Sequence, residues 1–118
     1  MPERTDRERL QDLHLAIVRA LEYVSGMSYE SFRADTKTQD AVIRNLEVIG
    51  EATKGLSTST RTRHAEIPWR QMAGMRDRLI HDYFGVNLDI VWQVVDLELP
   101  QLQRTLEVIL AETSHQDP

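Results

Sequence analysis

Hydrophobic residues recur every three or four positions along most of the chain, the pattern of helices that bury one face. The first apolar stripe consists of Leu10, Leu13, Ile17, Leu21 and Val24. Thr5 and Glu8 stand three residues apart just before it, in the order of a capping box. Ser25 and Gly26 interrupt the pattern. We therefore predict a first helix from about Thr5 to Val24.

Two further helices are predicted in the first half of the chain. A short helix is expected over residues 28–34, and a long one from about Thr38 to Leu56. The apolar face of the long helix consists of Val42, Ile43, Leu46, Ile49, Ala52 and Leu56. The polar run 57–60 follows Gly55 and predicts a loop.

The second half of the chain predicts two more helices. Pro68 suits a first helical position, where its missing N–H costs nothing, and the helix should run to about His81. Gly85 interrupts the pattern, and Asn87 can cap the last helix. The stripe of that helix consists of Leu88, Val91, Trp92, Val95, Leu99, Leu102, Leu106 and Ile109.

No segment alternates between apolar and polar residues, so no sheet is expected. The predicted fold class is all-α, a four- to five-helix antiparallel bundle formed by residues 1–118 as one domain. Pro100 should kink or split the last helix. The tail over about 113–118 is expected to be disordered. A surplus apolar stripe can also serve a homodimer interface.

Composition narrows the class of protein. The chain has 118 residues, of which 41% are hydrophobic, and this suits a single globular domain. No apolar run reaches the roughly 20 residues of a membrane span. Residues 1–6 have no apolar leader pattern, and a cytoplasmic location is expected. The chain has no cysteine, which excludes disulfides, thiolate metal sites and cysteine nucleophiles.

Charge is distributed unevenly. The net charge of −5 alone does not favour a nucleic-acid binder. Residues 54–81 nevertheless carry six basic and two acidic side chains, whereas residues 82–118 carry one basic and seven acidic ones. The basic residues, here called the positive zone, are Lys54, Arg61, Arg63, Arg70, Arg76 and Arg78. Such a zone can attract a phosphate-bearing ligand, although an ordinary solvated face would give the same composition.

A group of chemically able side chains ends the positive zone. Arg76, Asp77, His81 and Tyr83 fall within eight residues, where the predicted helix ends. Asp77 and His81 are four residues apart and would share a helix face, so the carboxylate could orient the imidazole. Arg76 and His81 would lie about 140° apart on the helix. Both could then border a groove formed with another helix or subunit.

These residue types suit phosphate chemistry. A guanidinium can clamp a phosphate through two hydrogen bonds, and a histidine can transfer a proton near neutral pH. Together they could cleave RNA without a metal, with the histidine activating the 2′-hydroxyl and the arginine stabilising the developing charge. The alternative is structural: His81 would cap the helix end, and Arg76 and Arg78 would form ordinary ion pairs.

Other polar residues carry weaker indications. His14 lies at the boundary of the first stripe, and His64 lies in a basic loop where a solvated position is expected. Glu47 and Glu51 are one turn apart, but no further ligand group accompanies them, so no metal site is predicted. No glycine-rich phosphate loop is present.

The motif Arg76-x4-His81-x-Tyr83 matches the R-x4–6-H-x-Y pattern of HEPN domains. Two longer segments sharpen the match. Residues 41–52, AVIRNLEVIGEA, and residues 67–85, IPWRQMAGMRDRLIHDYFG, resemble the corresponding segments of the HepT-like toxin family. The resemblance extends over residues 6–112, nearly the whole chain.

The resemblance implies an all-α homodimer in which two motifs build one composite cleft. Family members are described as metal-independent ribonucleases and as the toxins of two-gene toxin–antitoxin pairs. Their partner is a minimal nucleotidyltransferase of the MNT type, which acts as the antitoxin and can join the toxin in a higher-order complex. RNA is the expected substrate, and no cofactor is implied.

The resemblance also assigns roles to residues. Arg76 and His81 would be catalytic, with Asp77 orienting His81. Tyr83 would accept AMP from the nucleotidyltransferase, and the added anionic groups would block RNA. Further RNA-binding candidates are Arg70 and Arg78. Two alternatives stay open: a non-catalytic member that binds nucleotide or RNA and serves as partner and substrate of the transferase, and a structural helical adaptor.

Overall fold

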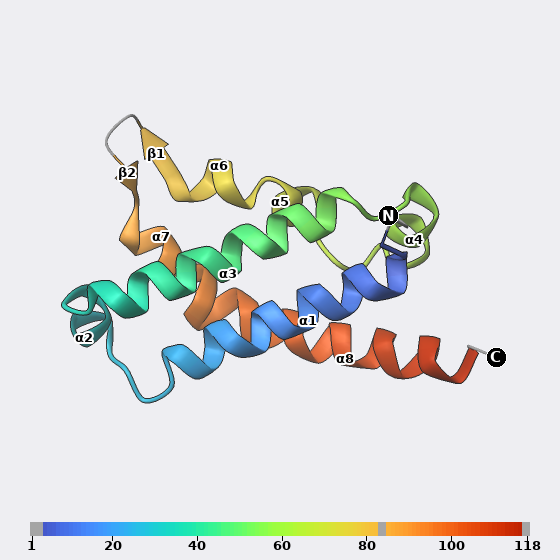
Figure 1. Cartoon of the computed structure of the whole chain (residues 1–118), viewed down its shortest axis with the longest axis horizontal. Helices are drawn as coiled ribbons and strands as arrows, with labels where there is room; N and C mark the ends of the chain where they lie inside the picture. The colour runs from blue at the N-terminus through green and yellow to red at the C-terminus, as the bar shows by residue number, and fades with distance from the viewer. Residues whose placement is uncertain (1–3, 83–84, 117–118) are drawn as a thin grey trace.

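Three long helices carry most of the core, as the apolar stripes predict. The computed structural model describes residues 4–82 and 85–116, with the backbone alone for residues 81, 82 and 113–116. The long helices are α1 (Asp6–Tyr23), α3 (Thr36–Lys54) and α8 (Leu99–Gln116). Figure 1 shows α1 between the other two and antiparallel to both. The predicted all-α class is thus confirmed in the described part of the chain.

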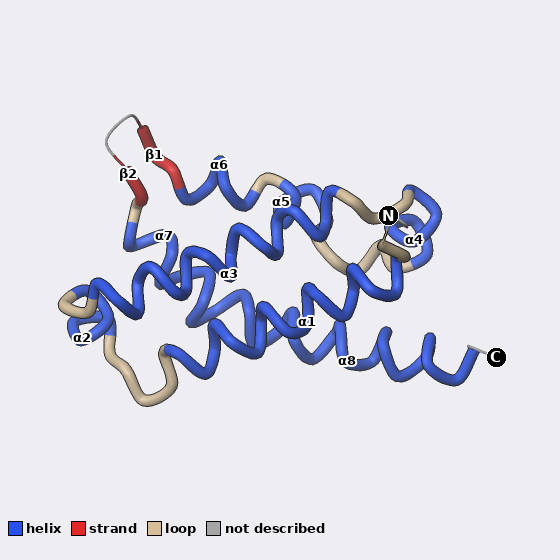
Figure 2. Tube along the Cα trace, viewed as in Figure 1, coloured by secondary structure: helices blue, strands red, loops and turns tan. Residues whose placement is uncertain are grey.

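Shorter elements complete the fold. They are α2 (Tyr29–Arg33), α4 (Thr58–Arg63), α5 (Trp69–Ala73), α6 (Met75–Leu79), β1 (Ile80–Asp82), β2 (Gly85–Val86), α7 (Leu88–Gln93) and the π-helix η1 (Val94–Glu98). Figure 2 shows β1 and β2 as a small hairpin that projects beyond α6. The expectation that no strands would form is therefore wrong at this one place.

The start of α1 is fixed by the predicted capping box. The Thr5 hydroxyl oxygen accepts from the Glu8 backbone N–H at 3.1 Å, and the Thr5 N–H donates to the Glu8 carboxylate at 2.9 Å. Both bonds satisfy donors that the first helical turn leaves open. The face that follows is buried at Leu10, Leu13, Ala16, Ile17 and Ala20. The predicted first helix is confirmed.

Helix α3 lies in contact with both α1 and α5–α6. Its side chains Val42, Leu46 and Ile49 have no exposed surface. Gly50 lies at the closest approach: a Cβ there would meet the Met72 carbonyl oxygen and the Met75 Cβ at 3.4 Å each. The missing side chain therefore lets α5 and α6 lie directly against α3.

The segment after α3 is helical where the polar sequence predicted a loop. Ser57 caps α4, since its hydroxyl accepts from the Thr60 N–H at 3.2 Å. The Trp69 indole then donates to the His64 carbonyl at 2.9 Å and draws this segment onto the core. His64 is consequently only 8% exposed, and its expected position in a solvated loop is wrong.

Pro100 interrupts the last predicted helix, as expected, and does so through a widened turn. The chain passes from α7 through η1 into α8, and the Leu99 N–H bonds to the Val94 carbonyl five residues back. In a regular α-helix the proline ring would collide with the carbonyl four residues before it. The π turn on its N-terminal side provides the extra room.

The C-terminal helix is longer than the sequence pattern indicated. Its backbone is helical to Gln116, although a disordered tail was expected over about 113–118. Residues 117 and 118 lie outside the described part. Within residues 4–82 and 85–116, no helix combines the length and the apolar character needed to cross a membrane.

Asp6 joins the first turn of α1 to the start of α4. Its carboxylate accepts from the Ser57 N–H at 3.1 Å, the Ser57 hydroxyl at 2.5 Å and the Thr60 hydroxyl. Partial burial acts to raise the pKa of Asp6, but the hydrogen bonds from Ser57 and Thr60 outweigh it and hold that pKa below its ordinary value of 3.8. The ionised form is therefore the one that stabilises the fold.

We expect Asp6→Asn to lower the free energy of unfolding by about 1–3 kcal/mol at pH 7, because the charged acceptor is lost. The contribution of Asp6 is complete above its unfolded pKa and is lost as the pH falls through the lower native pKa. The difference between variant and wild type should therefore shrink below about pH 3.8. Urea unfolding at pH 7 and pH 3 measures both effects, and Asp40→Asn at an exposed position serves as the control. A constant difference at both pH values would contradict this assignment.

Candidate functional site

The motif segment is a one-turn helix followed directly by a strand. The turn at Gly74 separates α5 from α6, so the predicted helix over residues 68–81 is divided in two. At Ile80 the backbone becomes extended, with φ −87° and ψ 102°. Arg76 and Asp77 therefore lie on a helix, whereas His81 lies on β1.

The hairpin that carries His81 is closed by Asn87. In the antiparallel pair, Ile80 lies opposite Val86. Gly85 has a φ of +136°, which favours glycine. The Asn87 N–H donates to the Leu79 carbonyl at 2.8 Å. The same residue caps α7, since its side-chain oxygen accepts from the backbone N–H groups of residues 89 and 90 at 3.0 and 3.2 Å.

The strand changes the expected relation between the motif residues. Asp77 and His81 do not share a helix face, because the helix ends at Leu79, and the predicted angle of about 140° between Arg76 and His81 does not apply. Tyr83, the predicted modification site, lies outside the described residues. Arg76, Asp77 and His81 are close along the chain. The prediction that Asp77 orients His81 from the same helix face does not hold, because Asp77 lies on α6 and His81 lies on β1.

Arg76 and Asp77 are exposed at the surface of α6. Neither side chain forms a hydrogen bond or ion pair with any residue whose side chain the structure describes. Arg70, on the preceding helix α5, is exposed in the same way. A guanidinium without a protein partner keeps its donors available for an anionic ligand. Arg76 and Arg70 thus meet the first requirement of phosphate-binding residues.

Arg78 is in a different position, since its guanidinium bonds to Glu98 through two hydrogen bonds. Nη1 and Nη2 donate to the two carboxylate oxygens at 3.0 and 2.8 Å. These hydrogen bonds raise the pKa of Arg78, against the opposing effect of partial burial. The side chains are 32% and 39% exposed, respectively. Arg78 was predicted to contact RNA, yet its charge is already neutralised within the protein.

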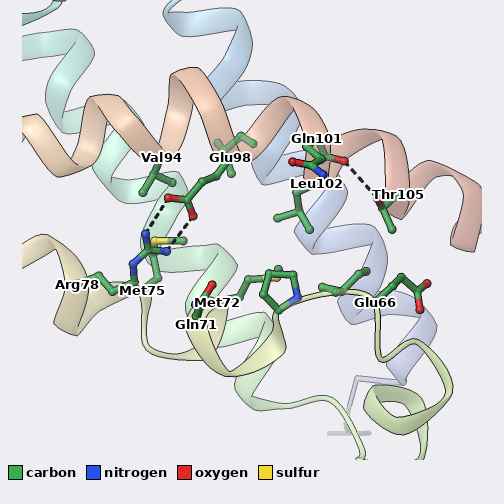
Figure 3. A pocket seen from close by; sticks show the side chains of 13 residues that line it. Glu66, Gln71, Met72, Met75, Arg78, Val94, Glu98, Gln101, Leu102 and Thr105 are labelled. Carbon is green, nitrogen blue, oxygen red and sulfur yellow. Dashed lines mark hydrogen bonds and ion pairs between the residues drawn. The ribbon is translucent and has the colours of Figure 1, made fainter.

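The Arg78–Glu98 pair borders a cavity of about 270 Å³ between α5–α6 and η1–α8. Figure 3 shows Arg78 and Glu98 reaching toward each other from opposite walls. Apolar side chains such as Met72, Met75 and Leu102 line much of the rest. The motif helix α6 therefore contacts α3 and α7 and also borders this cavity.

The basic residues of the positive zone have unequal roles in the structure. The Arg61 guanidinium donates to the Thr53 carbonyl at 2.8 Å and the Lys54 carbonyl at 3.1 Å, at the end of α3. Cations at this end of a helix satisfy its last carbonyls. Lys54 lies 3.5 Å from Glu51, and Arg78 is held by Glu98. Three arginines of the zone form no side-chain bond with described residues: Arg63, Arg70 and Arg76.

The weaker candidates have structural surroundings. His14 lies 3.1 Å from Glu107, between α1 and α8, which agrees with its expected position at the boundary of the stripe. Glu51 pairs with Lys54. Among the residues whose side chains are described, no three His, Asp or Glu residues gather in a possible metal-ligand set.

Comparison with known proteins identifies the family. The sequence model described as "Ribonuclease HepT-like" matches residues 13–109, most of the chain. This chain belongs to the HepT-like ribonuclease family. The resemblance expected from the motif segments is confirmed, and with it the predicted enzyme class, a ribonuclease.

Relatives of this HepT-like chain carry consistent names. A "Probable ribonuclease HepT" of Thermococcus cleftensis is 44% identical over 105 residues, which cover 89% of this chain and 96% of the relative. A "Putative RNase" of Caldanaerobacter subterraneus is 46% identical over 76% of this chain and 80% of its own. The "mRNA nuclease HepT" of Shewanella oneidensis is 30% identical over 69% and 79%, respectively. No solved structure matches this chain significantly.

Sequence reasoning missed Glu98, which holds Arg78. The sequence held only a weak signal: in an uninterrupted helix Glu98 would share a face with Val91, seven residues earlier. In the structure the π turn intervenes, and the Glu98 side chain is 39% exposed. The partner could not be found from the sequence, because α6 approaches this helix only in the folded chain.

We expect Asn87→Ala to lower the free energy of unfolding by about 1 kcal/mol, because α7 loses its cap. The loss also loosens the hairpin end at residues 79–87, so limited proteolysis there should become faster. Asn87→Asp keeps the capping oxygen and should retain most of the stability. Urea unfolding and mass-mapped proteolysis of the three proteins provide the comparison. Equal cleavage in the alanine variant and the wild type would show that the side-chain cap of Asn87 does not restrain the hairpin, whose closing backbone bond to the Leu79 carbonyl both proteins keep.

Proposed function

We propose that this HepT-like protein is a metal-independent ribonuclease whose catalytic groups are Arg76 and His81. The observation that carries the proposal is the exposed Arg76 guanidinium, which has no described protein partner and stands one short turn before the strand that bears His81. The family assignment supplies the reaction class. The cleavage mechanism and the residue roles are inferred from the motif and its chemistry.

The proposed reaction is an internal attack on the RNA backbone. The His81 imidazole removes the proton of a 2′-hydroxyl, and the oxygen attacks the neighbouring phosphorus. The bond from phosphorus to the 5′-oxygen of the next nucleotide breaks, and that oxygen takes up a proton from solvent, which leaves a 2′,3′-cyclic phosphate and a new 5′-hydroxyl. Arg76 stabilises the negative charge that develops on the phosphate oxygens. Arg70, exposed on α5, is proposed to bind a flanking phosphate.

We further propose that two copies of the chain form the cleft together. Ile80 on β1 and Leu97 on η1 are 40% and 63% exposed, which is high for large apolar side chains close in sequence to the motif and to Glu98. A two-fold interface over this region would cover them and place two motifs near each other. Asp77 is retained as a positioning candidate for His81, either in its own chain or across such an interface.

We also propose that the protein is the toxin of a toxin–antitoxin pair, controlled by an MNT-type nucleotidyltransferase. The transferase would attach AMP through its phosphate to the Tyr83 hydroxyl, with pyrophosphate leaving from ATP. Tyr83 follows His81 by two residues, so the added anionic group would lie near the catalytic segment. Like charge and bulk would then oppose binding of an RNA phosphate.

A second function is favoured by one observation. The exposed carboxylate of Asp77 adjoins Arg76 in sequence, and residues 82–118 carry seven acidic side chains and one basic one. Negative charge near a phosphate site weakens the binding of polyanions. The alternative is therefore a non-catalytic member that binds nucleotide or RNA and serves as partner and substrate of the transferase.

We expect His81→Ala to reduce RNA cleavage at least about 100-fold, because the proton acceptor is removed. Cleavage by purified protein in EDTA, with products examined for cyclic phosphate ends, measures this. Intact mass must first confirm that no adenylate is present. His14→Gln, a histidine change between α1 and α8, should leave the rate unchanged. If wild-type protein of unmodified mass cleaves no RNA, the non-catalytic alternative replaces the proposal.

We expect Tyr83→Phe to keep most of the RNA cleavage and to abolish modification by the transferase, because only the acceptor oxygen is removed. Mass spectrometry after incubation with the MNT-type partner and ATP should show added adenylate on wild type alone. Tyr23→Phe, on α1, is the matched tyrosine control and should be modified like wild type. Equal modification of Tyr83→Phe and wild type would remove Tyr83 from the mechanism.

A further inference from the structure

The motif helix α6 has only weak support of its own. It contains five residues, about 7.5 Å of helix, which is far too short to be stable in isolation. Met75 and Leu79 anchor α6 to the core, since they are 2% and 1% exposed. Met75 and Arg78 also line the cavity of about 270 Å³. Contacts across that cavity therefore add to the contacts with α3 and α7 in holding α6.

The Arg78–Glu98 ion pair is the polar contact that crosses it. Among the residues whose side chains are described, it is the hydrogen-bonded link between α6 and the η1–α8 helix. Two parallel hydrogen bonds fix a guanidinium in one plane, which a single bond does not do. The pair thus restrains both the distance and the rotation of α6 relative to η1.

The π turn contributes to this contact. Glu98 is the last residue of η1, directly before the bond from the Leu99 N–H to the Val94 carbonyl. An uninterrupted helix would bring residue 98 onto the same face as the fully buried Val91, two turns earlier. With the widened turn in place, the Glu98 side chain is 39% exposed and binds Arg78. The interruption caused by Pro100 therefore lies next to Glu98, whose carboxylate binds Arg78.

We propose that the Arg78–Glu98 ion pair positions the catalytic segment, holding α6 so that Arg76 and His81 have their working geometry. Arg78 lies two residues after Arg76 and three before His81, so a rotation of this single turn moves both. Arg78 then acts through these residues and does not bind RNA. The inference rests on the proposed ribonuclease function for its kinetic consequence, but the restraint itself is a property of the fold.

The roles of positioning and of phosphate binding predict different kinetics. If Arg78 bound a phosphate, replacing Arg78 would raise KM and reduce the salt dependence of RNA binding. Neutralising Glu98 would instead release Arg78 and strengthen RNA binding. If the pair positions α6, either partner's loss lowers kcat with little change in KM. Glu98 is the informative residue, because a carboxylate cannot attract RNA.

The experiment compares Glu98→Gln and Arg78→Met with wild type. Glu98→Gln keeps the side-chain shape, Arg78→Met keeps an unbranched apolar stem without the guanidinium, and each removes one charge of the pair. We expect kcat to fall about 10- to 100-fold in each, with KM within about twofold, because small displacements of catalytic groups have effects of this size. Asp12→Asn is the matched control. It breaks the two-bond pair between Arg4, before α1, and Asp12 on α1, at 2.7 Å each, and should leave kcat unchanged.

Amide hydrogen exchange at residues 75–82 gives a readout that does not need activity. Faster exchange there in both pair variants, with unchanged exchange in the core of α1 and α3, supports the restraint. This holds even if no protein in the series cleaves RNA, because absence of cleavage would count against the proposed function alone. Unchanged exchange at 75–82 overturns the inference. So does a wild-type or higher kcat in Glu98→Gln. A uniform rise in exchange over the whole chain would show a general stability role and also overturn it.

Discussion

Close packing on the two sides of α3 is the constraint on which the rest of the structure depends. One side of α3 meets α1, and at Gly50 the helix meets the α5–α6 junction, where a Cβ would lie 3.4 Å from both the Met72 carbonyl oxygen and the Met75 Cβ. Interiors are packed so tightly that a shift of one element is felt by its neighbours. Contacts with α3 therefore set the position of α6 first. The polar contact across the cavity then restrains the rotation of α6.

The sequence predicted the parts of the fold that depend on local periodicity. The capping box at Thr5, the buried faces of α1 and α3 and the interruption at Pro100 all follow from residues close together along the chain. The all-α class follows from the same stripes. Local rules suffice for these elements because each stripe is long enough to define its own buried face.

The parts that could not be predicted depend on contacts between distant residues. Helical spacing of apolar residues continues through Leu79, and no residue nearby indicates the strand that follows. The helix ends at Leu79, whose carbonyl accepts a hydrogen bond from the Asn87 N–H. His64 is buried in a segment whose backbone carbonyl accepts from the Trp69 indole, a contact between residues five apart that the polar composition does not indicate. The same limit applies to the site: the motif indicated candidate residues, but whether an arginine is free or bound to another part of the protein depended on Glu98 and on the end of α3.

The engaged arginines change the physical argument for RNA binding. A count of basic residues treats Arg61, Arg76 and Arg78 as equivalent sources of positive potential. In the structure Arg61 satisfies the carbonyls at the end of α3, and Arg78 is neutralised by Glu98. The potential at the motif then comes mainly from side chains such as Arg70 and Arg76 within an acidic chain. A weak field of this kind disfavours indiscriminate binding of polyanions. In the proposed ribonuclease, catalysis would then depend on accurate placement of Arg76, and the proposed restraint of α6 by the Arg78–Glu98 ion pair would matter most under these conditions.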